Sequence, residues 1–133
     1  MNKKYASIET EEFPYVVVTF TGNAANQENF SLYLSELKEI YDKKKEVTIL
    51  FDASKAVFPG ISFQKKQATW LTENEKLMKD YCLGTAYVIP NLIIRNVLKT
   101  IFKFQKQPVP YYVSSEFSEA EDWLNERLNN AST

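Results

Sequence analysis

The chain has 133 residues, which suits a single domain, 1–133, with one hydrophobic core. Its formal net charge of −1 argues against a general nucleic-acid-binding protein, which would be expected to be basic. The chain contains no histidine, which removes the commonest general base and most zinc and iron sites. We therefore expect no catalytic residues, no metal and no cofactor.

The first part of the chain predicts two strands, a helix and a third strand. Residues 4–10 alternate loosely, and the β-branched and aromatic run 15–20 is typical of a strand buried on both faces. Between residues 26 and 44, apolar residues recur at spacings of four, three and four, which predicts one face of a helix that Asn26 can cap. The run "EVTILFD" is a second buried strand, and it ends in Asp52.

The middle of the chain alternates helices with strands. Ser62 is predicted to cap a helix that extends to residue 81, and "LGTAYVI", 83–89, is a third buried strand. Asn91 can then cap a helix whose apolar face is formed by Ile94, Val97, Leu98 and Ile101.

The last strand is "YYVSS", 111–115, and Ser118 with Glu121 has the capping-box spacing that opens a final helix. We expect the tail from residue 128 onward to be frayed. The order β-β-α-β-α-β-α-β-α predicts an α/β sandwich with a mostly parallel five-stranded sheet and an antiparallel first strand at its edge.

Several short segments carry a resemblance to a known family. They are the strand that ends in Asp52, Pro59 of "FPG", "QATWL" at 67–71, "GTAYV" at 84–88, "RNVLKTIF" at 95–102, "QPVPYYV" at 107–113 and "SEAEDWL" at 118–124. In this order the chain resembles the STAS domain superfamily, named for sulfate transporters and anti-sigma factor antagonists, and within it the SpoIIAA-like branch. Relatives of that branch also resemble CRAL-TRIO lipid-transfer domains. The resemblance implies a single STAS-like domain, and fold carries over better than function.

The resemblance also implies a modification site. In the anti-sigma antagonists, an Asp-Ser-Ser-Gly turn opens a helix after the strand that ends in Asp, and a partner kinase phosphorylates one of the serines. Counted from Asp52 without a gap, that turn falls on residues 60–63, where Ser62 alone matches. Ser62 is thus a candidate phosphoacceptor or anion site at a helix N-terminus. The alternative, which we favour, is a serine that only caps the helix.

A candidate ligand loop follows the strand that ends in Asp52. Open α/β sheets place ligands beyond the carboxyl ends of their strands, and the candidates in this loop are Asp52, Ser54, Pro59 and Gly60. The alternative is a carboxylate that orders the loop by accepting backbone N–H bonds. We favour that alternative, because no second carboxylate in the loop completes an acid–base pair.

A candidate basic contact surface lies in residues 83–115, which contain no acidic residue. Arg95, Lys99 and Lys103 recur every four residues and form one helical stripe, called the basic stripe below, with Lys106 beyond it. This surface could bind acidic partners, phosphates or anionic lipid headgroups. The alternative is a solvated helix face beside the acidic last helix.

These patterns predict a non-enzymatic interaction or regulatory module with an unidentified protein partner, and they leave homodimerisation open. The alternative function is a pocket between sheet and helices that binds a lipid or another apolar ligand, for which we expect a volume of roughly 300 Å³ or more. No apolar run approaches the roughly 18 residues of a membrane helix, so we expect no transmembrane segment. The single cysteine, Cys82, fits a cytoplasmic location.

Overall fold

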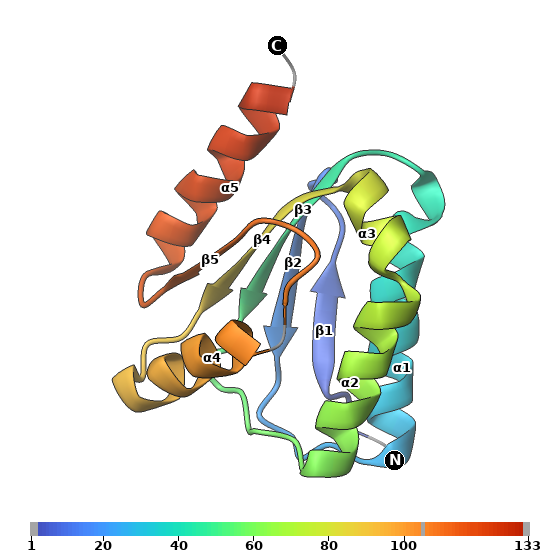
Figure 1. Ribbon diagram of the computed structural model, residues 1–133, viewed down its shortest axis with the longest axis vertical. Helices are drawn as coiled ribbons and strands as arrows, with labels where there is room; N and C mark the ends of the chain where they lie inside the picture. Colours follow the sequence, from blue (N-terminus) through green and yellow to red (C-terminus); the bar gives the residue numbers. More distant parts are fainter. Residues whose placement is uncertain (1–2, 105, 132–133) are drawn as a thin grey trace.

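The computed structural model describes residues 3–104 and 106–131, and it is a five-stranded sheet with helices on both faces (Figure 1). The strands are β1 (Ala6–Glu9), β2 (Tyr15–Phe20), β3 (Val47–Asp52), β4 (Cys82–Val88) and β5 (Tyr111–Ser114). The helices are α1 (Gln27–Glu39), the short 3-10 helix η1 (Ile40–Lys43), α2 (Ile61–Glu73), α3 (Glu75–Tyr81), α4 (Leu92–Phe104) and α5 (Phe117–Ala131).

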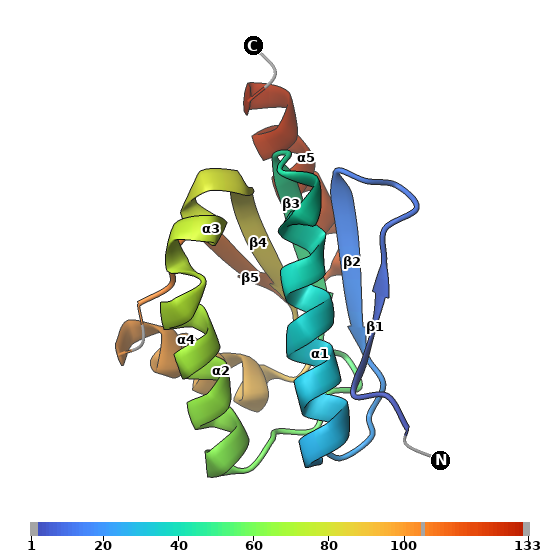
Figure 2. The same cartoon turned by 90° about the vertical axis from the view of Figure 1, so that its right-hand side faces the viewer.

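The strands are hydrogen-bonded in chain order. β1 pairs antiparallel with β2, and β2, β3, β4 and β5 are mutually parallel, which confirms the predicted sheet. Parallel crossovers are right-handed, and each one here steps to the next strand in the same direction. Helices α1, α2, α3 and α4 must therefore lie on one face of the sheet, which leaves the other face to α5. In Figure 2, α1 and α2 accordingly stand in front of the sheet and α5 behind it.

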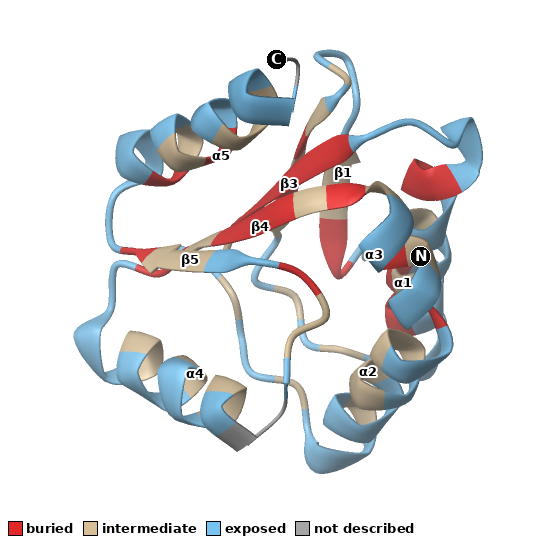
Figure 3. Cartoon of the chain, turned by 45° about the horizontal axis from the view of Figure 1, so that its top comes forward, coloured by how far each residue is buried: buried red, intermediate tan, exposed pale blue. Residues whose placement is uncertain are grey.

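Two apolar layers hold the helices to the sheet, and the alternation of side chains along each strand supplies both. On β2, Val16 and Val18 face the layer that α1 covers, whereas Val17 belongs to the layer under α5. On β3, Ile49 faces α1 and Leu50 faces α5. Burial is accordingly concentrated in the central strands β3 and β4 (Figure 3).

Two helices begin where the sequence predicts. The Asn26 side chain accepts a hydrogen bond from the Asn29 N–H, and the Asn29 side chain accepts one from the Asn26 N–H, both at 2.8 Å, so that α1 opens with a complete capping box. The Asn91 side chain accepts from the N–H groups of Ile93 and Ile94 at 2.9 and 3.1 Å, which caps α4.

The predicted N-cap at Ser62 is wrong. Helix α2 begins at Ile61, and Gly60 occupies the N-cap position without a side-chain hydrogen bond. The reason is that the Gly60 carbonyl already accepts from the N–H groups of Phe63 and Gln64, at 3.0 Å each. Ser62 therefore lies in the first turn of the helix, where it is exposed.

The single helix predicted over 62–81 is also interrupted. Asn74 has φ −110° and ψ 13°, outside the helical region, and it separates α2 from α3. Its backbone N–H and its side-chain amide both donate to the Trp70 carbonyl, at 2.9 and 2.8 Å. Competition of this kind by an Asn side chain explains the break, which spacing of apolar residues alone does not reveal.

The start and the end of the last helix differ from expectation as well. Helix α5 begins at Phe117, so the predicted capping box of Ser118 and Glu121 is wrong. Ser114 organises this turn instead, because its hydroxyl accepts from the Glu116 N–H and donates to the Glu119 carboxylate, both at 3.0 Å. The helix continues to Ala131, beyond the residue at which we expected fraying to begin.

Candidate functional site

An apolar cavity of about 220 Å³ lies between the sheet, α1, α2 and α4. Among the strands, α4 packs mainly against the edge strand β5, so its inward side chains face the cavity instead of the centre of the sheet. The volume is below the roughly 300 Å³ that we expected for a ligand pocket. It is nevertheless far larger than the voids that close-packed protein interiors ordinarily contain.

Three parts of the fold wall the cavity. The strands and their ends contribute Tyr5, Phe20, Ile49, Phe51, Thr85, Tyr87 and Ile89. The helices contribute Phe30, Tyr33, Leu37, Tyr41, Gln64, Gln67, Trp70, Leu71, Met78, Ile94, Leu98, Ile101 and Phe102. The loop between β3 and α2 contributes Ala53, Ala56, Val57, Phe58 and Pro59, and Gln107 completes the wall.

A continuous series of aromatic rings forms the floor of the cavity. Phe51 stacks on Tyr87 at 5.0 Å and on Phe20 at 6.2 Å between ring centroids, so the rings follow β4, β3 and β2 across the sheet. Tyr5 meets Phe20 edge to face at 5.5 Å, and Phe102 of α4 meets Tyr87 at 5.2 Å. Each such contact adds about 0.5–1.5 kcal/mol beyond the area it buries, so the rings stabilise the floor of the cavity.

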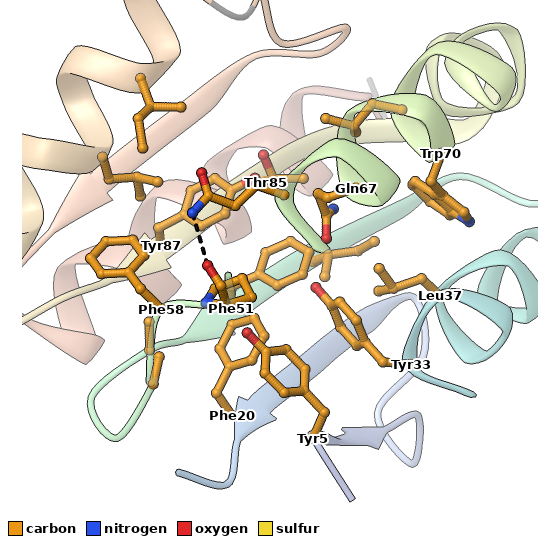
Figure 4. Close-up of a pocket in the computed structure, with 18 of the residues that line it drawn as sticks. Tyr5, Phe20, Tyr33, Leu37, Phe51, Phe58, Gln67, Trp70, Thr85 and Tyr87 are labelled. Carbon is orange, nitrogen blue, oxygen red and sulfur yellow. Dashed lines mark hydrogen bonds between the residues drawn. The ribbon is translucent and has the colours of Figure 1, made fainter. Parts of the chain in front are cut away.

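A few uncharged polar groups interrupt this apolar wall. In Figure 4 the Tyr33 phenol, from α1, and the Gln67 amide, from α2, point toward one another into the cavity. Within the described residues, neither group makes a hydrogen bond, and the Tyr5 phenol makes none either. The cavity thus offers hydrogen-bonding groups that have no partner among the described residues.

The tyrosines of the cavity are neutral at physiological pH. Burial raises the pKa of Tyr5 to about 12, and it raises the pKa values of Tyr33 and Tyr87 well above the usual tyrosine value. Burial also raises the pKa of the neighbouring Cys82 thiol, to about 11. A protonated, buried thiol is a poor nucleophile, so Cys82 offers no reactive group beside the cavity.

The rim of the cavity exposes apolar side chains. Val57 and Phe58 line the cavity and yet are 47% and 48% exposed, and Ile61 of the adjoining helix is exposed as well. On α4, Ile93 is 74% exposed and Val97 is 44% exposed. The prediction that Val97 belongs to the inward face is therefore wrong: Val97 lies about 100° around the helix from Leu98, which does face the cavity.

The predicted ligand loop divides into two parts. The Asp52 carboxylate accepts from the Ser54 N–H at 3.1 Å and from the Ser54 hydroxyl at 2.6 Å, which is the loop-ordering role that we favoured. Neither Asp52 nor Ser54 lines the cavity. Pro59 does line it, while its carbonyl accepts from the Gln64 side chain at 2.8 Å. Gly60 and Ser62 lie outside the lining, at the start of α2.

The residues of the basic stripe also differ in their surroundings. The Arg95 guanidinium donates to the carbonyls of Ile89 and Pro90, at 2.9 and 3.3 Å, and so fastens α4 to the end of β4. Lys99 and Lys103 are exposed, and no acidic side chain of the described residues pairs with them. The acidic last helix does not neutralise them, since α5 covers the opposite face of the sheet.

Lys106 belongs to a different neighbourhood. The pKa of the Glu75 carboxyl, at the start of α3, is lowered mainly by its hydrogen bond with Lys79, and Lys106 adds a smaller favourable charge. Lys106 lies beyond the end of α4 at Phe104, so it does not extend the stripe on that helix.

The residues that face the cavity from α1 and α2 were not among the predicted site residues. Tyr33 lies on the apolar face of α1 with Phe30 and Leu37, at helical spacings of three and four. Gln67 occupies the corresponding face of α2, between Phe63 and Trp70. The sequence feature that could have identified both residues is a polar group on an otherwise apolar helix face, because an ordinary core position would hold an apolar residue.

Comparison with known proteins supports the fold. No protein-family model and no curated protein matches the chain. A solved structure does match, that of an uncharacterised protein of the DUF3478 family with a SpoIIAA-like fold from Shewanella loihica PV-4. It has a TM-score of 0.67 and 13% sequence identity, and the match covers 93% of this chain and 98% of that chain. The chain thus has a SpoIIAA-like, STAS-like α/β fold, as the sequence resemblance implies.

None of the helices in the described part of the chain combines the length and the apolar character needed to cross a membrane.

Proposed function

We propose that this protein is a non-enzymatic cytoplasmic module that binds a small apolar ligand in the cavity between the sheet, α1, α2 and α4. The observation that carries the proposal is the cavity itself, 220 Å³ of space walled by aromatic and aliphatic side chains. The cavity is partly open at its rim, where Val57 and Phe58 are about half exposed. An apolar ligand that covers the lining contributes about 25 cal/mol for each Å² of apolar surface that it removes from water, so an occupant would stabilise the fold.

The chemistry of the lining favours binding over catalysis. Of the described residues that line the cavity, the ionisable ones are Tyr5, Tyr33, Tyr41 and Tyr87, and burial raises the pKa of every one of them. Acid–base catalysis near neutral pH needs groups whose pKa values lie close to that pH. The lining supplies hydrophobic contact and hydrogen bonds instead, which are the elements of a ligand pocket.

The proposal is tested through Trp70, which lines the cavity, whereas Trp123 of α5 stacks on Tyr112 of β5 at the opposite face of the sheet. In a Trp123→Phe background, Trp70 fluorescence reports on the cavity alone. We expect apolar ligands to change that fluorescence saturably, and we expect native mass spectrometry of the purified protein to show a bound small molecule.

Two matched substitutions locate the binding site. Ala56 lines the cavity, so Ala56→Phe should fill part of it and weaken binding at least about tenfold. Ala24 is exposed and lies outside the lining, so Ala24→Phe should leave binding unchanged. The proposal is wrong if no mass is bound and no apolar compound alters Trp70 fluorescence, or if both substitutions act alike.

A second candidate function is contact with an acidic macromolecule through α4. Lys99 and Lys103 are exposed without an acidic neighbour among the described residues, and the exposed Ile93 and Val97 lie on the same helix. Basic and apolar groups together suit a regulatory contact with a partner.

A further inference from the structure

The Tyr33 phenol donates to no acceptor among the described residues. The residue is only 3% exposed, and its hydroxyl makes no hydrogen bond to the described residues. A ligand that covers this hydroxyl must replace its hydrogen bond to water, because a buried hydroxyl without a hydrogen bond is unfavourable. The Gln67 amide faces the Tyr33 phenol across the cavity and is likewise free of hydrogen bonds within the described residues (Figure 4). The two groups converge on one place, where a ligand oxygen can accept from both.

The lining determines the charge that such an oxygen can carry. No lysine or arginine of the described residues lines the cavity; Lys99 and Lys103 of α4 lie outside the lining. An ionised carboxylate buried here would lose its hydration without gaining a counter-ion, which costs several kcal/mol. The raised pKa values of Tyr5 and Tyr33 keep their phenols protonated as donors. The ligand oxygen must therefore be uncharged and must accept hydrogen bonds. A hydroxyl or carbonyl oxygen meets both conditions, whereas an ionised carboxylate does not meet the first.

The volume determines the size of the apolar part. An apolar cavity of about 150 Å³ in another protein holds one benzene molecule, and a water-sized group takes about 30 Å³. The present 220 Å³ therefore exceeds a single ring and corresponds to about seven groups of that size. A chain of about eight carbon atoms, or a pair of fused rings, fits this space.

We infer that the ligand is an uncharged amphiphile, with an apolar body of this size and one hydroxyl or carbonyl oxygen that it buries against Tyr33 and Gln67. This inference rests on the proposed function and adds the ligand's class and its orientation, with the polar end inward. The apolar end then lies toward Val57 and Phe58 at the rim.

Three probes of similar size test the inference by calorimetry at pH 8: 1-octanol, octanoate and propylbenzene, which has no polar atom. We expect 1-octanol to bind at least about tenfold more tightly than octanoate. Tyr33→Phe should weaken 1-octanol about threefold to tenfold, the factor that corresponds to one ordinary hydrogen bond, and should change propylbenzene less than twofold. Gln67→Leu should act in the same direction. Tyr81→Phe, a matched change outside the lining, should leave all three affinities unchanged.

The possible results separate the inference from the proposed function. Octanoate binding as tightly as 1-octanol would overturn the inference while the ligand-binding function stands. So would a Tyr33→Phe effect of equal size on 1-octanol and on propylbenzene, since the loss would then be one of packing. Absence of binding by all three probes would overturn both. The thermal stability of Tyr33→Phe is measured separately. A general loss of stability would weaken 1-octanol and propylbenzene alike, so it cannot produce the expected difference between them.

Discussion

At the scale of single residues, the start of α2 shows that a serine near the N-terminus of a helix need not cap that helix. Gly60 has φ −62° and ψ 167°, the extended geometry of an N-cap, but it has no side chain to accept a hydrogen bond. Ser62 lies in the first turn, exposed, so its hydroxyl does not serve as the cap. Asn26, by contrast, accepts from the Asn29 N–H at the start of α1.

This contrast leads to a paired prediction. Ser62→Ala should change the free energy of unfolding by less than about 0.5 kcal/mol, as an exposed substitution without a specific contact does. Asn26→Ala removes half of a capping box and should cost about 1 kcal/mol. Urea unfolding of the two variants beside the wild type measures both. A loss of about 1 kcal/mol in Ser62→Ala would contradict the N-cap assignment to Gly60. The role of Ser62 as a phosphoacceptor stays a prediction.

The polar residues of the cavity show which features of single residues can be predicted from the sequence. Tyr33 and Gln67 stand at positions where helical periodicity predicts a core residue, so both were visible as polar groups on apolar faces. Their convergence could not be predicted, because it depends on the distance and the angle between α1 and α2. Asp52 shows the reverse case. Its position at a strand end suggested a ligand, and its hydrogen bonds to Ser54 show it ordering the loop.

At the scale of elements, α4 has three distinct faces. Ile94, Leu98, Ile101 and Phe102 face the cavity, Ile93 and Val97 are exposed, and the basic stripe occupies a third side. The sequence predicts the helix, its Asn91 cap and the alignment of the stripe, since all three depend only on spacing. The prediction that Val97 faces inward was wrong, because the width of the inward face depends on the distance between α4 and the sheet. Arg95 likewise proved to be a structural contact, which four-residue spacing does not reveal.

The basic stripe gives a prediction in which Arg95 is left intact, because its bonds to Ile89 and Pro90 fasten the helix. Wild-type protein should bind an acidic peptide or anionic vesicles at low salt, and Lys99→Gln with Lys103→Gln should weaken that binding. Sedimentation with vesicles and fluorescence anisotropy with the peptide measure the two probes. The attraction should fade as salt rises toward 0.1 M, where the Debye length is about 10 Å.

A matched pair controls for net charge. Lys38 and Lys65 are exposed on α1 and α2, so Lys38→Gln with Lys65→Gln removes two charges from other parts of the surface. If the double variant at 99 and 103 binds like this control, the stripe is an ordinary solvated face. If only the control retains binding, α4 is a contact surface.

At the scale of the whole molecule, the order of the strands produces the cavity. Three successive right-handed crossovers in one direction set α1, the α2–α3 pair and α4 side by side on one face, with α4 at the end beside β5. The alternation of elements predicts the mostly parallel sheet and its crossover helices from sequence, but it does not predict the order of the strands. The cavity is a different matter, because it depends on whether side chains of α2 and α4 meet across the sheet. The break at Asn74, which shortens α2, is one feature of that packing that periodicity did not predict.

The buried tyrosines make the whole fold sensitive to alkali. A tyrosine in the unfolded chain ionises near pH 10, whereas burial raises the pKa of Tyr5 to about 12 and that of Tyr33 well above the usual value. The folded state therefore favours the protonated phenols. Their contribution to stability is fully present below about pH 10, and it is lost as the pH rises through the folded-state pKa values. Cys82 acts in the same direction from a lower pH, since burial raises its pKa to about 11.

The resulting prediction concerns the slope of stability against pH. Above about pH 10, each phenol that ionises only on unfolding should lower the free energy of unfolding by about 1.4 kcal/mol per pH unit. Urea unfolding between pH 8 and about pH 11 should show this decline, and Tyr5→Phe with Tyr33→Phe should make it shallower. Because phenylalanine cannot ionise, the double variant can be less stable at pH 8 and still decline more slowly. A wild-type stability that stays constant up to about pH 11 would mean that these phenols are already open to solvent. The cavity would then lack the dry, neutral lining on which the choice of an uncharged ligand depends.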